Sequence, residues 1–354
     1  MARLTGAPPD LAAQGWRWPA EWETHHATWL AWPHNPATWP GRIESIFAPY
    51  VEMIRVLHQY EPVCVCVRDE AMEADARRRL AAGGVDADRG VRFHHVPTDD
   101  TWARDHGPIF VVREREGRRE KAIVDFGFNS WGEKYGPWEN DDAVPARICE
   151  ILGLPRVEAG FVLEGGSIDG NGLGAILTTE SCLLNPNRGP ERTREGMEGL
   201  LARLLGARHV LWLGDGIEGD DTDGHIDDLA RFVDAGTVVT VVEEDPFDAN
   251  HARLAENLRR LRSFRDQDGK PLTVATLPMP PPLLIEGQRC PASYANFYLA
   301  NGVALVPVFG APSDARALAI LRDLLPGRQI AGIPSADLVF GLGAMHCMTQ
   351  QEPA

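Results

Sequence analysis

The chain has 354 residues, of which 44% are hydrophobic and 24% are charged, which is typical of a globular protein with a large core. Its 51 Asp and Glu residues outnumber its 35 Lys and Arg residues and give a formal net charge of −16. Because phosphate-bearing partners attract basic surfaces, this charge argues against nucleic acid and anionic membranes as partners. The sequence contains no apolar run of signal-peptide or membrane-spanning length, so we expect a cytoplasmic protein.

Amphipathic patterns typical of helices alternate along the chain with short β-branched runs. The chain has 35 Gly and 27 Pro residues, so we expect short elements and many turns. The pattern predicts an α/β fold with mixed sheets, forming one domain over 1–354 in which 1–18 is peripheral or poorly ordered. The predicted helices cover 41–60, 70–82, 141–152, 190–206, 250–263 and 313–324. The predicted strands cover 62–67, 108–112, 122–126, 174–178, 208–213, 237–242, 303–308 and 328–333.

Polar segments that hold reactive residue types recur at a nearly even interval. By subtraction, the steps between these residues are 59, 61, 71 and 51 positions. Such spacing is typical of a radial repeat in which each unit sends one loop to a shared centre. An ordinary α/β fold with polar loops stays the alternative, because no residue identity links the units. The recurring residues are Asp105, Glu164, His225, Asn296 and Cys347.

The six cysteines show neither a CxxC pair nor a paired spacing typical of zinc sites or disulfides. Four of them lie in apolar stretches and are expected in the core, namely Cys64, Cys66, Cys149 and Cys182.

Cys347 differs from these four because its neighbours are not typical of a core. The run GLGA (341–344) precedes it and TQQ (349–351) follows it. Small residues such as Gly343 permit a substrate to approach the backbone closely. We therefore consider Cys347 a candidate nucleophile and Gly343 a candidate substrate contact.

A nucleophilic thiol needs a base and a charge that favours the thiolate. His346 is adjacent to the cysteine in sequence and is expected to point elsewhere. His225, in DDTDGHIDD (220–228), is the better candidate. Asp227 follows it by two residues, so the two side chains share one face if the segment is extended. The segment does not fit an EF-hand loop, and a solvated turn stays the alternative to catalysis.

Two further carboxylates lie where apolar runs meet glycines. Asp105, in WARDHGP (102–108), is either a turn-capping residue or a carboxylate that faces a cation. Trp102 would supply a flat wall against a planar cation. Glu164, in VLEGGS (162–167), is either a loop residue or the partner that orients a histidine.

This combination of cysteine, histidine and carboxylates favours chemistry on a guanidinium group. Two carboxylates can hold a guanidinium by bidentate, charge-assisted hydrogen bonds. A thiolate then attacks the central carbon, and the histidine first protonates the leaving ammonia and later activates water. We therefore expect a small cationic guanidine as partner, with no metal and no organic cofactor. A non-catalytic guanidinium-binding protein is the alternative from another class.

Eight segments, in order, resemble the agmatine deiminase family, which is grouped with the bacterial-type peptidylarginine deiminases. The resemblance covers roughly 19 to 353 and implies the pentein fold, a five-bladed α/β propeller of ββαβ units with its site at the axis. It also implies hydrolysis of agmatine to N-carbamoylputrescine and ammonia, a step toward putrescine. The segments are 19–33, 102–108, 125–138, 162–167, 177–190, 219–228, 296–302 and 346–351.

The resemblance implies a role for each matching polar residue. Cys347 would be the nucleophile, and His225 would be the general acid and base. Asp105 and Asp227 would bind the guanidinium, and Glu164 would orient His225. Trp102 and Asn296 would line the pocket.

The distal end of the substrate is left open by two departures from the family. Glu133 and Ala344 stand where the enzymes most firmly associated with agmatine have Gly and Asn. The acidic cluster Asp220, Asp221 and Asp223 would meet the distal ammonium of agmatine, with solvated turn carboxylates as the alternative. Arg188 or Arg68 would clamp the carboxylate of an arginine substrate. A deiminase of free or peptidyl arginine and an amidinotransferase therefore stay alternatives. The oligomeric state is open and includes a homo-oligomer.

Overall fold

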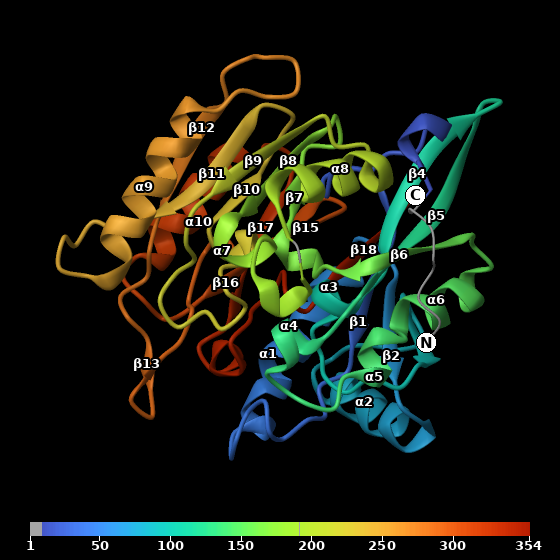
Figure 1. The fold of residues 1–354 in the computed structure, drawn as a ribbon. Coiled ribbons are helices and arrows are strands. Elements are labelled where there is room, and N and C mark those ends of the chain that lie inside the picture. Colours follow the sequence, from blue (N-terminus) through green and yellow to red (C-terminus); the bar gives the residue numbers. More distant parts are fainter. Residues whose placement is uncertain (1–8, 191) are drawn as a thin grey trace.

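Five small mixed sheets form the fold of residues 9–190 and 192–354, the part of the chain that this computed structural model describes (Figure 1). In each sheet one strand pairs antiparallel with a second, and a helical connection then leads to a strand parallel to the second. The mixed α/β class is thus confirmed, and four of the five sheets have the ββαβ order that the family resemblance implied, while the first adds β3 and takes its antiparallel strand β18 from the end of the chain. The radial arrangement of five blades stays a prediction.

The first sheet is built from both ends of the chain and has the order β18-β1-β2-β3. Its strands are β18 (Gln350–Pro353), β1 (His25–Ala31), β2 (Val63–Val67) and β3 (Val91–His95). The next two sheets contain β4 (Ile109–Arg115), β5 (Arg118–Gly127) and β6 (Arg156–Val162), and β7 (Asp169–Gly170), β8 (Ala175–Thr179) and β9 (His209–Leu213). The fourth sheet contains β10 (Ala230–Phe232), β11 (Thr237–Val242) and β12 (Thr273–Pro278). The fifth contains β15 (Tyr298–Ala300), β16 (Val303–Val308) and β17 (Gln329–Pro334). β13 (Leu284–Ile285) and β14 (Gln288–Arg289) form a separate hairpin.

The amphipathic helices lie where the sequence predicts them. Because one face of each is apolar, each packs against a sheet and connects its parallel strands. The long helices are α1 (Ile43–Leu57), α2 (Glu70–Ala82), α6 (Val144–Leu152), α8 (Arg194–Leu205), α9 (Ala249–Ser263) and α10 (Asp314–Leu324). Single helical turns are α3 (Ala103–His106), α4 (Ser130–Glu133), α5 (Glu139–Asp142) and α7 (Glu180–Leu183). None of the described helices is long and apolar enough to cross a lipid bilayer.

The N-terminal segment is more tightly packed than predicted. Residues 1–8 lie outside the described residues, but three side chains within 9–18 are part of the core. Leu11, Trp16 and Trp18 are buried against α8 and the second sheet. The Trp18 backbone N–H donates to the carbonyl of Leu205 at 2.9 Å. The expected peripheral segment is therefore corrected for residues 9–18, because indole burial fixes it in place.

The C-terminal tail is ordered, as predicted, because it supplies a strand. β18 pairs antiparallel with β1, with Gln350 opposite Trp29 (Figure 1). The loop between β17 and β18 carries Cys347, and the other four recurring residues likewise lie in connections from one sheet to the next. Even spacing along the chain thus reflects one such connection per ββαβ unit.

We predict that the C-terminal closure depends on Glu352. Its carboxylate accepts hydrogen bonds from Trp29 Nε1 at 3.0 Å and from Lys121 Nζ at 2.6 Å, and it is buried. Glu352→Gln should lower the free energy of unfolding by about 2 kcal/mol in urea denaturation, because the Lys121 ammonium loses a charged acceptor. The exposed Glu114→Gln should change it by less than about 0.5 kcal/mol. Equal values for the two variants would contradict this role.

Candidate active site

Three functional side chains converge over the backbone of Gly166, in the connection between β6 and β7. A Cβ at this glycine would lie 2.6 Å from His225 Nδ1, 2.7 Å from Asp105 Oδ1 and 3.1 Å from Asp227 Oδ2. Such distances leave no room for a side chain, so the site requires glycine here. The sequence-predicted acid/base and both predicted guanidinium ligands therefore share one buried cluster.

Asp105 lies on α3 and is held by three donors or cations. Trp131 Nε1 donates to its Oδ2 at 2.9 Å, and the Gly166 N–H donates to its Oδ1 at 3.0 Å. His225 Nδ1 lies 3.6 Å from the same Oδ1. Burial, together with the charge of Asp227, raises the pKa of Asp105 to about 6, although His225 and Trp131 oppose the shift.

His225 is fully buried, and neither of its ring nitrogens makes a hydrogen bond within the described residues. Burial disfavours its charged form, but the charge of Asp105 and the contact with Cys182 raise its pKa well above the ordinary value. The ring is therefore an imidazolium near neutral pH. A charged donor in a closed site is suited to protonating a leaving group.

Cys347 is 5% exposed and contacts Asn296 and Asp227 rather than His225. Asn296 Nδ2 donates to the sulfur at 3.0 Å, and Asp227 Oδ2 lies 3.6 Å from it. The Asn296 Oδ1 accepts the backbone N–H of His346 at 3.0 Å, so one amide fixes both the thiol and its loop. Burial, and then the charges of Asp227, Asp228 and Asp105, raise the pKa of the Cys347 thiol well above its ordinary value.

His346, which was expected to point elsewhere, contacts the site through Asp227 in a way that sequence reasoning missed. Its Nδ1 lies 2.7 Å from Asp227 Oδ2, and its Nε2 lies 2.7 Å from Glu21 Oε2. These bonds hold the pKa of Asp227 low against the effect of burial. Neither the sequence spacing nor a motif signals that His346 orients Asp227.

Glu164 lies beside His225, together with Cys182, which the sequence placed in the core only. Ligand atoms of Glu164, Cys182 and His225 lie within 4.8 Å of one another, a set that could hold a metal ion. The Glu164 carboxylate, however, accepts Arg188 Nε at 2.9 Å, and the field of Arg192 also reaches Glu164 and Cys182. Two guanidinium groups repel a cation, so we assign no metal chemistry to this set.

The residues predicted to line the pocket fall into two groups. Trp102 is buried, and a Cβ at Gly343 would lie 2.3 Å from its ring. Only glycine therefore leaves room for the indole at position 343. Asp221 is half-buried and contacts the segment 130–135, because its carboxylate accepts a hydrogen bond from the Tyr135 hydroxyl at 2.5 Å. Burial raises the pKa of Asp221. Glu133, one of the departures from the family, has a left-handed φ of 62° in the same loop.

The match of a family model settles the relationship. The Porphyromonas-type peptidyl-arginine deiminase model matches residues 17–353. The chain belongs to this deiminase family. An agmatine deiminase of Ectopseudomonas mendocina is 38% identical, and the alignment covers 100% of this chain and 99% of that deiminase.

Solved structures of deiminases agree with this relationship. The agmatine deiminase of Enterococcus faecalis superposes with a TM-score of 0.89 at 32% identity, covering 100% of this chain and 99% of that one. A cysteine-to-serine variant of the C. jejuni agmatine deiminase with substrate bound gives 0.85 at 30% identity, covering 96% of both chains. An amidinotransferase of Microseira wollei, at 13% identity and a TM-score of 0.50 over 94% of this chain and 95% of that one, shares the fold alone.

We predict that His346→Gln lowers deiminase kcat by about 10- to 100-fold while KM changes little, because an unrestrained Asp227 misplaces the thiol and the bound group. Far-UV circular dichroism should be unchanged. His209→Gln, at an exposed position, should leave kcat unaltered. A rise in KM alone would instead assign His346 to substrate binding.

Proposed function

We propose that this deiminase hydrolyses agmatine to N-carbamoylputrescine and ammonia through a covalent adduct on Cys347. The observation that carries the proposal is the buried cluster in which a thiol, an imidazolium and the carboxylates of Asp105 and Asp227 meet. Relatives that align over the full chain are named agmatine deiminase.

The charges of the site explain how a cationic substrate starts the reaction. Without substrate, burial and three neighbouring carboxyl groups keep Cys347 protonated, which also protects it from oxidation, since oxidation proceeds through the thiolate. A guanidinium bound by Asp105 and Asp227 places one positive charge in the same low-dielectric volume. It offsets the carboxylates and lowers the cost of forming a thiolate. The substrate thus contributes to activating its own nucleophile.

The steps balance with the groups present. As the substrate binds, the Cys347 thiol loses its proton to solvent by way of Asp227, whose Oδ2 lies 3.6 Å from the sulfur. The thiolate then forms a C–S bond to the guanidinium carbon, and the tetrahedral adduct expels ammonia after the His225 imidazolium donates its proton. A cationic amidino-thioether stays on the sulfur. Neutral His225 then takes a proton from water, the hydroxide adds to the same carbon, and the C–S bond breaks. The ureido product leaves, and the thiolate returns.

The cations near the site favour a substrate without a carboxylate. Arg188 is buried and occupied by Glu164, Asp223 and the carbonyl of Thr222. Lys134 pairs with Asp223 at 2.9 Å. Neither group is free to clamp the carboxylate of arginine, and Arg68, the other candidate clamp, lines a cavity that shares no lining residue with the Cys347 cluster. The half-buried Asp221 stays the proposed partner of the distal ammonium of agmatine, and this supports agmatine over arginine.

We also propose that the protein acts in the cytoplasm, on the way to putrescine. All six cysteines are free, which fits a reducing cytoplasmic compartment. The product is a carbamoylated amine, so a role on the way to putrescine follows from the chemistry. One catalytic domain over the chain and assembly into a homo-oligomer are part of the proposal as well.

We predict that agmatine exceeds free arginine and a C-terminal arginyl peptide in kcat/KM by at least about a hundredfold, because an unpaired carboxylate must be desolvated beside Asp221. Ammonia release and mass spectrometry of the ureido product would measure it. Product formation that requires an added amine, without ammonia, would identify an amidinotransferase instead.

Cys347→Ala and Cys347→Ser should each lower kcat by about a thousandfold or more with unchanged folding, because neither side chain supplies a thiolate. Cys149→Ser is the matched control, since that thiol donates to the Leu154 carbonyl away from the site. Turnover retained in Cys347→Ala would remove the cysteine from the mechanism.

The pH dependence of Cys347 alkylation in the free enzyme tests the proposed activation. Because the pKa of the thiol is raised, the thiolate should be scarce at neutral pH, and the rate of modification by iodoacetamide should still be rising at about pH 9. In Asp227→Asn the rise should begin at lower pH, since the closest negative charge is removed. A rate that levels off near neutral pH in the wild type would contradict activation by substrate.

A further inference from the structure

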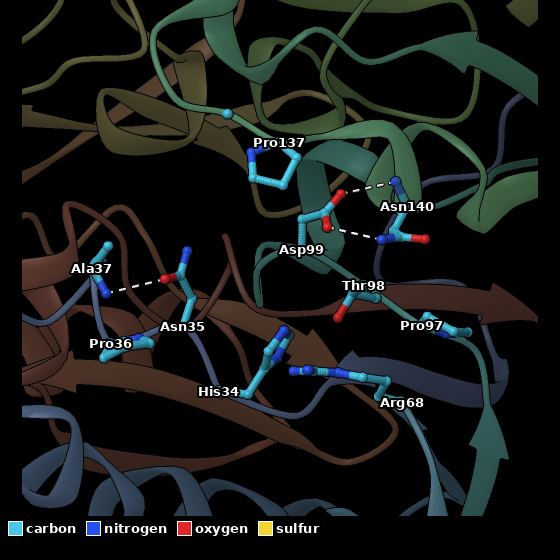
Figure 2. A pocket seen from close by; sticks show the side chains of 11 residues that line it. His34, Asn35, Pro36, Ala37, Arg68, Pro97, Thr98, Asp99, Pro137 and Asn140 are labelled. Carbon is cyan, nitrogen blue, oxygen red and sulfur yellow. Dashed lines mark hydrogen bonds between the residues drawn. The ribbon is translucent and has the colours of Figure 1, made fainter.

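A second cavity, of about 420 Å³, lies apart from the thiol, at the carboxyl ends of β1, β2 and β3 (Figure 2). Segments 34–37, 97–99 and 136–140 form most of its wall, and Arg68 follows directly after β2. The carboxyl ends of parallel strands are where open α/β sheets usually bind ligands. Its volume suits a small metabolite.

Two donors without partners face this cavity. The guanidinium of Arg68 makes no hydrogen bond or ion pair within the described residues, and Figure 2 draws it beside His34. The hydroxyl of Thr98, on the same wall, likewise has no hydrogen-bond partner in the described part of the chain. Burial, together with the charge of Arg68, lowers the pKa of His34, so that this ring is neutral.

The carboxylates beside the cavity are already satisfied. Asp99 accepts the backbone N–H of Asn140 at 2.8 Å and its Nδ2 at 2.9 Å, so both oxygens are used (Figure 2). Asp100 accepts the Thr38 hydroxyl at 2.6 Å and the Thr101 N–H at 2.8 Å, and burial raises its pKa to about 6. Each oxygen of Asp99 thus already accepts one hydrogen bond, and the raised pKa of Asp100 reduces its negative charge near pH 6.

A second guanidinium lies behind the same wall. Arg147 donates to the Pro97 carbonyl at 2.6 Å and to the Asn140 Oδ1 at 3.3 Å. Within the described residues Arg147 forms no ion pair with a carboxylate. Its charge therefore adds to that of Arg68 at the cavity.

We propose that this cavity binds a small anion, through the guanidinium of Arg68 and the hydroxyl of Thr98. Free donors and two guanidinium groups without carboxylate partners in the described part of the chain favour an oxyanion. Carboxylate and phosphate groups share this chemistry. On a protein with a net charge of −16, such a site is a local exception. The proposal does not depend on the reaction at Cys347.

Isothermal titration of the intact protein, with inorganic phosphate in one series and succinate in another at constant ionic strength, tests the proposal. At least one anion should bind with saturable, one-to-one heat, and the responding series identifies phosphate or carboxylate as the preferred group. Arg68→Gln should weaken that binding at least about tenfold, because a charge-assisted donor is lost. Arg322→Gln, an exposed arginine on α10, should bind as the wild type does.

Thr98→Val is the sharpest variant. Valine keeps the shape and the β-branching of threonine but removes the hydroxyl donor, so anion binding should weaken by about three- to tenfold. Unchanged agmatine turnover would show that the variant is folded. The absence of saturable binding by either anion, or binding as tight as that of the wild type in Arg68→Gln and Thr98→Val, would overturn the proposal.

Discussion

The structure depends on a single buried carboxylate, that of Glu21. Its Oε1 accepts the Leu299 backbone N–H at 2.8 Å and lies 2.9 Å from Arg231, while its Oε2 faces Arg104 at 3.2 Å and His346 at 2.7 Å. Burial alone would raise its pKa, but the charges of Arg231, His346 and Arg104 hold that pKa well below its ordinary value. A buried ion is tolerated only when it is paired so completely.

The consequence is geometric, because the partners of Glu21 come from different parts of the fold. Arg104 lies on α3, Arg231 on β10, Leu299 on β15 and His346 in the loop before β18. The connections that carry Asp105 and Cys347 both contact this one charge, through Arg104 and His346. Through His346 this charge also positions Asp227, and Asp227 in turn contacts the sulfur of Cys347. The ionic centre and the catalytic centre are therefore one network.

Much of this could be predicted from sequence, because periodicity and residue type are local signals. The six long helices and the strands β2, β4, β5, β8, β9, β11, β16 and β17 were predicted with small errors at their ends. β1 was missed because its sequence, HHATWLA, mixes polar, small and aromatic residues and is not a β-branched run like β2 or β8. β18 was missed because its polar residues, among them Glu352, are buried by partners distant in sequence.

The site could be predicted only in part, for a similar reason. Cys347, His225 and the carboxylates were signalled by their chemistry, their spacing and the family resemblance. The roles of Glu21, His346 and Cys182 rest on contacts between residues far apart in the chain, and no short motif encodes such contacts. The proposed chemistry depends above all on the covalent role of Cys347. The measurement is mass spectrometry of protein quenched in acid during agmatine turnover. The mass of the peptide that contains Cys347 should increase by the mass of agmatine minus that of ammonia. Steady turnover with that peptide always unmodified, or an adduct on another cysteine, would contradict the covalent role.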